Sequence, residues 1–272
     1  MTQPTPRQLL TVALAAAEEA GARAMKWFRE PPPAETKHDG TLVTRADRET
    51  EEVLRAAILR EFPDHAVLGE EAGATDGSAP YRWIVDPIDG TESFVRGVPL
   101  WGVLIGVEAR GRGGEDGEML VGVCHMPGIG ETVAAARGEG CTWNGWPCGV
   151  SGVSDLAKAT VAVTSPRASR RRTANYLALE DRVMRVRGWS DCYAYVLVAT
   201  GRVDAALDPV MKPWDCAPFA TILDEAGGRF TDWAGRPTIH GGDAVASNGL
   251  LHDAVLGVLS GRAPGGTRPA SS

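Results

Sequence analysis

Hydrophobic positions recur with a helical period at the start of the chain. From Pro6 to Phe28 apolar residues return every three or four positions, and the prolines that begin at Pro31 cannot continue a helix. The apolar run Leu9–Ala17 imitates a signal peptide, but it leads directly into Glu18 and further charged residues. The pattern therefore predicts an amphipathic first helix over residues 6–28 and no cleaved leader.

The rest of the chain alternates short apolar runs with turn-forming residues. A second helix is expected from about Arg45 to Arg60, and later helices at about Cys192–Thr200 and Asp215–Ala226. The expected strands are Val67–Leu68, Tyr81–Val85, Trp101–Glu108, Leu120–His125, Thr160–Thr164 and Val203–Leu207. Strands and helices alternate in the second half, which favours an α/β arrangement there.

A change of composition toward Gly, Ser and Asp around residues 148–157 divides the chain. We expect an N-terminal α+β half over residues 1–150 and a C-terminal α/β half over residues 151–262. Residues 263–272 are small and polar, and they are expected to form a disordered tail.

Composition narrows the class of protein. Of the 272 residues, 43% are hydrophobic and 23% are charged, as in ordinary soluble globular proteins. The net charge of -7 argues against a general binder of nucleic acid or of an anionic membrane. No apolar run approaches the roughly 18 residues that a membrane span needs. The five cysteines have no metal-site spacing, so we expect reduced thiols in a cytoplasmic protein.

Acidic residues stand where the predicted elements begin or end. Asp47 opens the second helix and Glu70 follows a strand, while Asp86 and Asp89 bracket a proline and Asp215 opens a later helix. Pro87 restricts the backbone, and Gly90 permits backbone torsions that larger residues resist. The carboxylates of Asp86 and Asp89 and a carbonyl between them can therefore face one point. Such oxygen ligands suit Mg²⁺. Taken singly, each aspartate could equally be a turn or capping residue.

Taken together, the motifs resemble those of the inositol monophosphatase-like superfamily. The segments Gly69–Glu71, Trp83–Phe94 and Pro213–Asp215 resemble its three metal motifs in order and approximate spacing. The segments Lys37–Asp47 and Glu225–Gly228 resemble its N-terminal loop and its C-terminal glycine turn. The resemblance implies a layered α-β-α-β-α sandwich, commonly a homodimer, that hydrolyses a small phosphate monoester by means of Mg²⁺-activated water.

The resemblance also assigns roles to individual residues. Two or three Mg²⁺ ions would be held by Glu70, Asp86, the Ile88 carbonyl, Asp89 and Asp215. The implied catalytic residues are Asp47, Thr91 and Glu70, with Asp47 and the Thr91 hydroxyl polarising the attacking water. Backbone N–H groups of Gly90 and Thr91 would contact the phosphate. Lys37 is either a ligand of the phosphate or of a nearby water, or a plain surface lysine.

The residues before the last metal motif point to a substrate class. The segment Gly188–Tyr195 resembles the Gly-Asp-Cys-Tyr-Gly-Tyr segment of the superfamily's histidinol-phosphate phosphatases more than the Gly-Ser-Ala-Ala segment of its inositol-type enzymes. Histidinol carries a cationic amine, with which Asp191 could pair. Asp208 could add a second negative charge, and Tyr193 or Tyr195 could flank the imidazole.

Other interpretations of these residues stay open. Asp191 could instead cap a helix, and both tyrosines could be core residues. Glu92 could select a cation, extend the metal set or face solvent. An inositol monophosphatase or a promiscuous sugar-phosphate phosphatase is the alternative function. A non-catalytic binding protein of the same fold is the remote one.

Overall fold

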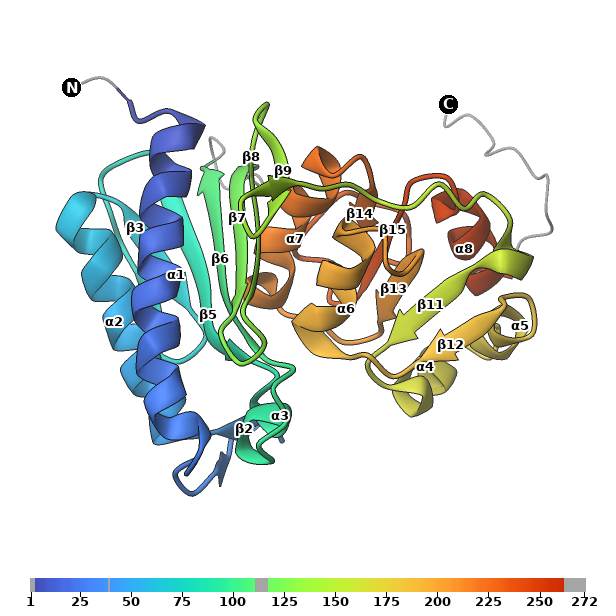
Figure 1. The fold of residues 1–272 in the computed structure, drawn as a ribbon, viewed down its shortest axis with the longest axis horizontal. Helices are drawn as coiled ribbons and strands as arrows, with labels where there is room; N and C mark the ends of the chain where they lie inside the picture. Colours follow the sequence, from blue (N-terminus) through green and yellow to red (C-terminus); the bar gives the residue numbers. More distant parts are fainter. Residues whose placement is uncertain (1–2, 39, 111–116, 262–272) are drawn as a thin grey trace.

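Two large β-sheets and three helical layers make up most of the molecule (Figure 1). The computed structural model describes residues 3–38, 40–110 and 117–261, so the predicted tail over residues 263–272 lies outside the described residues. One sheet has eight strands in the order β10-β9-β8-β7-β6-β5-β3-β4, and the other has five in the order β12-β11-β13-β15-β14. All strands of the larger sheet precede those of the smaller one in the sequence.

The larger sheet comprises β3 (Ala66–Gly69), β4 (Gly73–Thr75), β5 (Tyr81–Asp89), β6 (Gly102–Ala109), β7 (Glu118–Met126), β8 (Glu131–Ala136), β9 (Gly140–Trp143) and β10 (Trp146–Pro147). The smaller sheet comprises β11 (Thr160–Val163), β12 (Arg185–Arg187), β13 (Ala205–Asp208), β14 (Arg229–Thr231) and β15 (Ala244–Ser247). A separate pair consists of β1 (Glu35–Thr36) and β2 (Leu42–Val43). The helices are α1 (Pro6–Phe28), α2 (Arg45–Glu61), α3 (Thr91–Val95), α4 (Pro166–Arg172), α5 (Tyr176–Glu180), α6 (Asp191–Ala199), α7 (Pro213–Glu225) and α8 (His252–Leu259).

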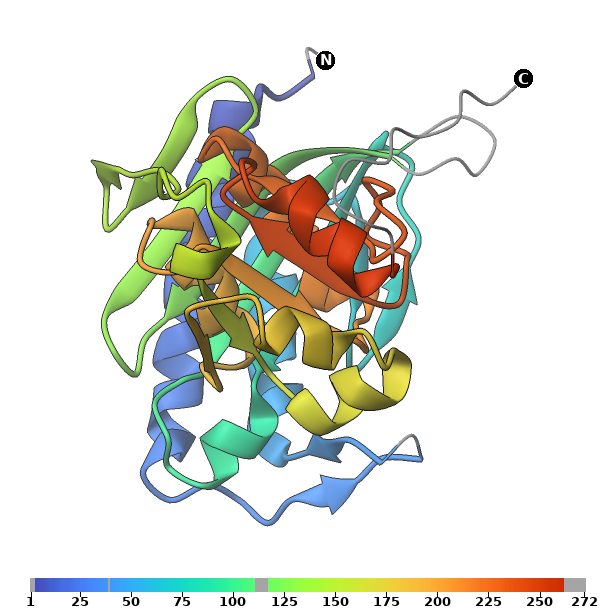
Figure 2. The ribbon, with the colours of Figure 1, turned by 90° about the vertical axis from the view of Figure 1, so that its right-hand side faces the viewer.

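The layers follow from which faces are apolar. Helices α1 and α2 cover one face of the eight-stranded sheet, and α6 and α7 fill the space between the two sheets. Helices α5 and α8 cover the outer face of the five-stranded sheet and lie in front of it in Figure 2. The α-β-α-β-α sandwich predicted from the sequence is confirmed.

Helix α1 shows how local signals set the bounds of an element. Thr5 and Gln8 form a capping box and Pro6 occupies the first helical position, which together fix the start. The buried face of α1 is mostly alanine, so the helix packs closely on the sheet. The bounds of α1 agree with the predicted helix, residues 6–28. None of the described helices is both long and apolar enough to cross a bilayer.

Strand β5 differs from the prediction, and the difference concerns the site. The strand expected to end at Val85 continues to Asp89, because β6 goes on pairing with it: Asp86 pairs with Leu104 and Asp89 with Gly102. The register shifts between these two pairs, which accommodates a proline that has no backbone N–H to donate. The two aspartates therefore lie on a strand of the sheet and not in a free turn.

Candidate active site

A cavity of about 510 Å³ opens where β5 ends and α3 begins. Every residue predicted to hold metal lines this cavity, together with Lys37 and Asp191. Asp86 and Asp89 come from β5 of the larger sheet, whereas Asp191 and Asp215 belong to the first turns of α6 and α7. Segments that are far apart in the sequence therefore meet at one opening.

Three carboxylates form the centre of the cavity. Asp86, Asp89 and Asp215 each offer an oxygen, and these atoms lie within 4.8 Å of one another. Burial and repulsion from neighbouring carboxylates raise the pKa of Asp86 and of Asp89 well above the ordinary value. Burial, together with repulsion from Glu70 and Asp191, raises the pKa of Asp215 to about 7. Buried like charges at this separation are stabilised by a cation, and an all-oxygen donor set fits a hard divalent ion such as Mg²⁺.

Backbone N–H groups orient these carboxylates. The N–H of Ile88 donates to Asp86 Oδ1 at 2.9 Å, and the N–H of Cys192 donates to Asp89 Oδ2 at 2.6 Å. Asp215 Oδ2 accepts from the N–H of Lys212 at 2.8 Å. In each case one oxygen is engaged by the backbone, which leaves the other for a cation.

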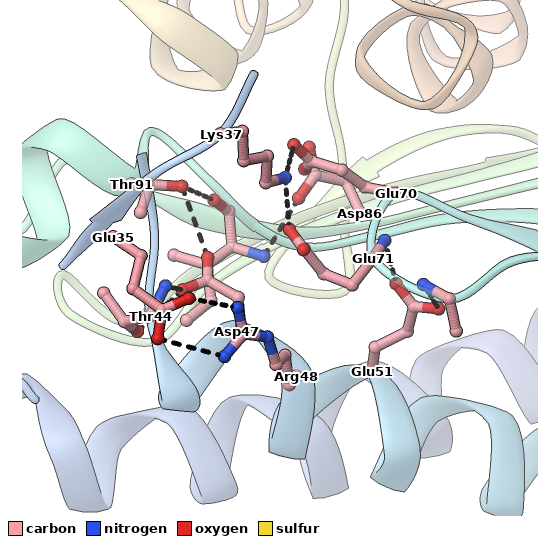
Figure 3. A network of polar contacts seen from close by, with 12 residues as sticks. Glu35, Lys37, Thr44, Asp47, Arg48, Glu51, Glu70, Glu71, Asp86 and Thr91 are labelled. Carbon is pink, nitrogen blue, oxygen red and sulfur yellow. Dashed lines mark hydrogen bonds and ion pairs between the residues drawn. The ribbon is translucent and has the colours of Figure 1, made fainter. Parts of the chain in front are cut away.

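Lys37 connects two glutamates at the edge of the cavity (Figure 3). Its Nζ lies 2.7 Å from Glu70 Oε1 and 2.6 Å from Glu71 Oε1. Burial opposes the charged ammonium, but the two carboxylates hold the pKa of Lys37 above its ordinary value. Burial raises the pKa of Glu71 to about 7 even so. Lys37 is therefore not a plain surface lysine, which was one of the two interpretations of the sequence.

Thr91 and Asp47 form a second group next to the cavity (Figure 3). Thr91 Oγ1 lies 3.1 Å from the Ile88 carbonyl oxygen and 3.3 Å from Asp47 Oδ1. Asp47 is 1% exposed and lies behind Thr91, where its Oδ2 accepts from the N–H and the hydroxyl of Thr44, both at 2.7 Å. Burial raises the pKa of Asp47, although the hydrogen bonds from Thr44 oppose the rise.

Gly90 links β5 to α3 in a conformation that other residues rarely adopt. Its φ is +85°, and a Cβ at this position would lie 3.1 Å from the Leu100 carbonyl oxygen and 3.4 Å from Asp191 Oδ2. Glycine is therefore required both by the backbone torsion and by the close approach of neighbouring atoms. The turn places the first N–H groups of α3 at the cavity.

The residues predicted to select the substrate are only partly brought together. Asp191 lines the cavity, its Oδ2 accepts from the Ser190 hydroxyl at 2.9 Å, and burial raises its pKa. Asp208 lies deeper, in a smaller cavity of about 80 Å³ that Asp191 also lines. Asp208 Oδ2 accepts from the Tyr195 hydroxyl at 2.9 Å, and burial raises the pKa of Asp208 to about 7.

The two tyrosines and Glu92 do not lie beside the carboxylate cluster as Asp191 does. The Tyr195 ring is buried and stacks on Phe219 at 4.8 Å between centroids, as the core interpretation predicted. Tyr193 lies with its ring 5.8 Å from the guanidinium carbon of Arg202 and lines neither of these two cavities. Glu92 stands at the rim, 72% exposed, and pairs with Arg96 at 3.0 Å.

Two hydrogen bonds near the cavity were not predicted from the sequence. Thr164 accepts a hydrogen bond from the Asp191 N–H at 3.0 Å, and Cys192 supplies the N–H that holds Asp89. A threonine after a short strand carries no motif, and backbone donors carry no side-chain signal, so no sequence feature could have found either contact.

The chain belongs to the inositol monophosphatase family, whose sequence model matches residues 5–261. It is 41% identical to a histidinol-phosphatase of Chlorobaculum parvum over 257 residues, which cover 93% of this chain and 97% of the relative. A histidinol-phosphatase of Mycobacterium tuberculosis is 42% identical over 229 residues, covering 82% and 86%. The solved inositol monophosphatase of Anabaena is similar in fold, with a TM-score of 0.81 at 30% identity, covering 95% and 97% of the two chains. These similarities identify the protein as a phosphoric monoester hydrolase, as the motifs predicted.

Proposed function

We propose that this protein is a magnesium-dependent histidinol-phosphate phosphatase. The observation that carries the proposal is the position of Asp191: its Oδ2 is 3.4 Å from the point where a Cβ on Gly90 would lie, beside the carboxylate cluster. In histidinol phosphate the cationic amine is borne by the carbon next to the one that carries the phosphate ester. A carboxylate immediately beside the phosphate site is therefore well placed to pair with that amine. The two relatives named histidinol-phosphatase support the same substrate.

The metal site would hold two or three Mg²⁺ ions. Glu70, Asp86, Asp89, Asp215 and the Ile88 carbonyl would be the ligands, and all of them line the cavity. Bound there, Mg²⁺ would lower the pKa of water and offset the charge of the phosphoryl oxygens. Lys37 holds Glu70 in place through its 2.7 Å contact.

The remaining steps fall to side chains and backbone of this chain. The N–H groups of Gly90 and Thr91 would bind the phosphoryl group at the start of α3. The Thr91 hydroxyl would orient the attacking water, and Asp47, whose raised pKa suits a proton acceptor, would take up the proton through Thr91. The water oxygen bonds to phosphorus and the bond from phosphorus to the alcohol oxygen breaks. The alcohol oxygen takes a proton from solvent water and Asp47 returns its proton to solvent, so one water is consumed for each alcohol and inorganic phosphate released.

An inositol monophosphatase or a promiscuous sugar-phosphate phosphatase is the second candidate. The family and the Anabaena structure support it, and a cavity of about 510 Å³ could admit a neutral polyol. A non-catalytic binding protein is disfavoured because all the residues that we propose as metal ligands line the one cavity. We also propose a homodimer, on the basis of the family resemblance. The five free thiols support a cytoplasmic location.

Substrate preference tests the proposal. Phosphate release with Mg²⁺ is compared for L-histidinol phosphate, inositol 1-phosphate and fructose 1,6-bisphosphate. We expect kcat/KM to favour histidinol phosphate at least about tenfold, or about 1.4 kcal/mol. Asp191→Asn should remove most of this preference, because asparagine keeps the shape and tolerates the backbone torsion but has no charge.

Glu92→Gln is the matched control, since it neutralises an exposed rim carboxylate that already has an arginine partner. It should change the preference far less than Asp191→Asn. Equal rates on all three substrates would reject histidinol phosphate as the substrate and retain the phosphatase class.

A further inference from the structure

Asp191 has a backbone conformation that non-glycine residues rarely adopt. Its φ is +55°, a left-handed value that among the described non-glycine residues it shares with Asn144 alone. Asn144 lies in the tight turn between β9 and β10, where such torsions are common. Asp191 lies at the start of α6, where no turn of this kind requires it. Contacts from elsewhere in the fold must therefore hold this conformation.

Two hydrogen bonds flank the unusual torsion. The N–H of Asp191 donates to Thr164 Oγ1 at 3.0 Å, and the next N–H, that of Cys192, donates to Asp89 Oδ2 at 2.6 Å. The left-handed turn thus directs two successive N–H groups to two partners. The first of these partners is the neutral hydroxyl of the residue that directly follows β11 of the smaller sheet.

A buried carboxylate lies beside Thr164 on the core side. Strands β11 and β13 are parallel, with Val163 beside Leu207, so the residues that follow, Thr164 and Asp208, are neighbours. Asp208 is held from the core side, because its Oδ2 accepts from the Tyr195 hydroxyl at 2.9 Å. The contact that reaches the site from this part of the smaller sheet is therefore the hydrogen bond that Thr164 Oγ1 accepts from the Asp191 N–H.

We infer that Thr164 is a positioning residue that fixes the backbone of Asp191, and that it thereby sets the preference for a phosphate ester of a cationic amino alcohol. The inference rests on the function proposed above, because it concerns the residue that would recognise the amine. Asp208 and Tyr195 line the same small cavity as Thr164 and Asp191. The charge on Asp191 provides the attraction, and Thr164 determines where that charge lies.

Variants of Thr164 test this inference through the ratio of kcat/KM for L-histidinol phosphate to that for inositol 1-phosphate. Thr164→Val keeps the shape but cannot accept the Asp191 N–H, so the ratio should fall about tenfold, mainly through a higher KM for histidinol phosphate. Thr164→Ser keeps the hydroxyl and should retain most of the ratio. If Thr164→Val unfolds too readily to assay, Thr164→Ala replaces it with the same expected loss.

A double-mutant cycle separates positioning from a general structural effect. If Thr164 acts through Asp191, adding Thr164→Val to Asp191→Asn should not lower the ratio further. A wild-type ratio near one would reject the proposed function and this inference together. A high wild-type ratio that Thr164→Val leaves intact, or additive losses in the double variant, would overturn the inference alone.

Discussion

At the scale of single residues, Thr91 is the group on which the proposed chemistry depends most. One hydroxyl lies within hydrogen-bonding distance of the Ile88 carbonyl and of Asp47, and the same residue begins α3. Asp47 is buried behind it, so Thr91 is the link between Asp47 and the cavity. Removing the hydroxyl should therefore disconnect Asp47 from the reacting water.

We expect Thr91→Val to lower kcat about 100-fold or more, the usual range for the loss of one proton-transfer group. Thr91→Ser keeps the hydroxyl and should lose far less. Initial rates with saturating Mg²⁺ and histidinol phosphate measure the difference. Similar kcat values for the two variants would show that the hydroxyl has no part in the reaction.

The sequence predicted which residues line the site better than it predicted their conformations and contacts. The predicted metal ligands all line one cavity, because each occupies a motif whose spacing is visible in the chain. The torsion of Asp191 could not be predicted, since it depends on Thr164, 27 positions away. The bridging role of Lys37 between Glu70 and Glu71 likewise depends on a loop that folds back onto β3.

At the scale of elements, α7 packs directly against the backbone of the larger sheet at Gly122. A Cβ added to Gly122 on β7 would lie 2.0 Å from the Pro218 carbonyl oxygen of α7. Backbone atoms cannot move aside as a side chain can, so α7 reaches this position only over a glycine. Asp215 lies in the first turn of the same helix, so the contact also helps to place a proposed metal ligand.

Gly122→Ala should lower the free energy of unfolding by about 1–3 kcal/mol or more, through overpacking. The matched control is Gly152→Ala, because Gly152 is exposed and a Cβ there would meet nothing within 4 Å. Urea unfolding followed by tryptophan fluorescence measures both variants. Equal stability of the two would mean that α7 can shift without cost.

The elements that were predicted correctly have strong local signals. The bounds of α1 follow from a proline, a capping box and a long amphipathic repeat. Strands β9, β10 and β12 are two to four residues long, too short for an alternating pattern to be visible, and they form only because neighbouring strands pair with them. The extension of β5 to Asp89 has the same cause.

At the scale of the whole molecule, the carboxylate cluster joins the two sheets. Asp86 and Asp89 come from the larger sheet, and Asp215 comes from the helix between the sheets, after β13 of the smaller one. The folded-state pKa of Asp215, about 7, exceeds its unfolded value of about 3.9. The metal-free protein therefore binds more protons when folded, and it should lose stability as the pH rises between these two values.

Mg²⁺ should reverse this loss. At pH 8 we expect chelation to lower the Tm, and Mg²⁺ at 100 times its Kd should add about 2.7 kcal/mol per site. Asp86→Asn removes one repelling charge, so its metal-free form should be at least as stable as the wild type and gain less from Mg²⁺. Thermal melts with and without chelator measure both effects. A wild-type Tm that does not respond to Mg²⁺ would reject the proposed metal site.

Because the site is divided between parts of the two halves of the fold, the recovery of enzyme activity reports on one particular step of folding. The bond between the Cys192 N–H and Asp89 exists only when α6 is docked against the end of β5. A molecule in which each sheet had formed but the two were not yet apposed would have near-native circular dichroism and no turnover. Recovery of turnover during refolding would therefore time the final docking step, and recovery of secondary structure would time only the steps that precede it.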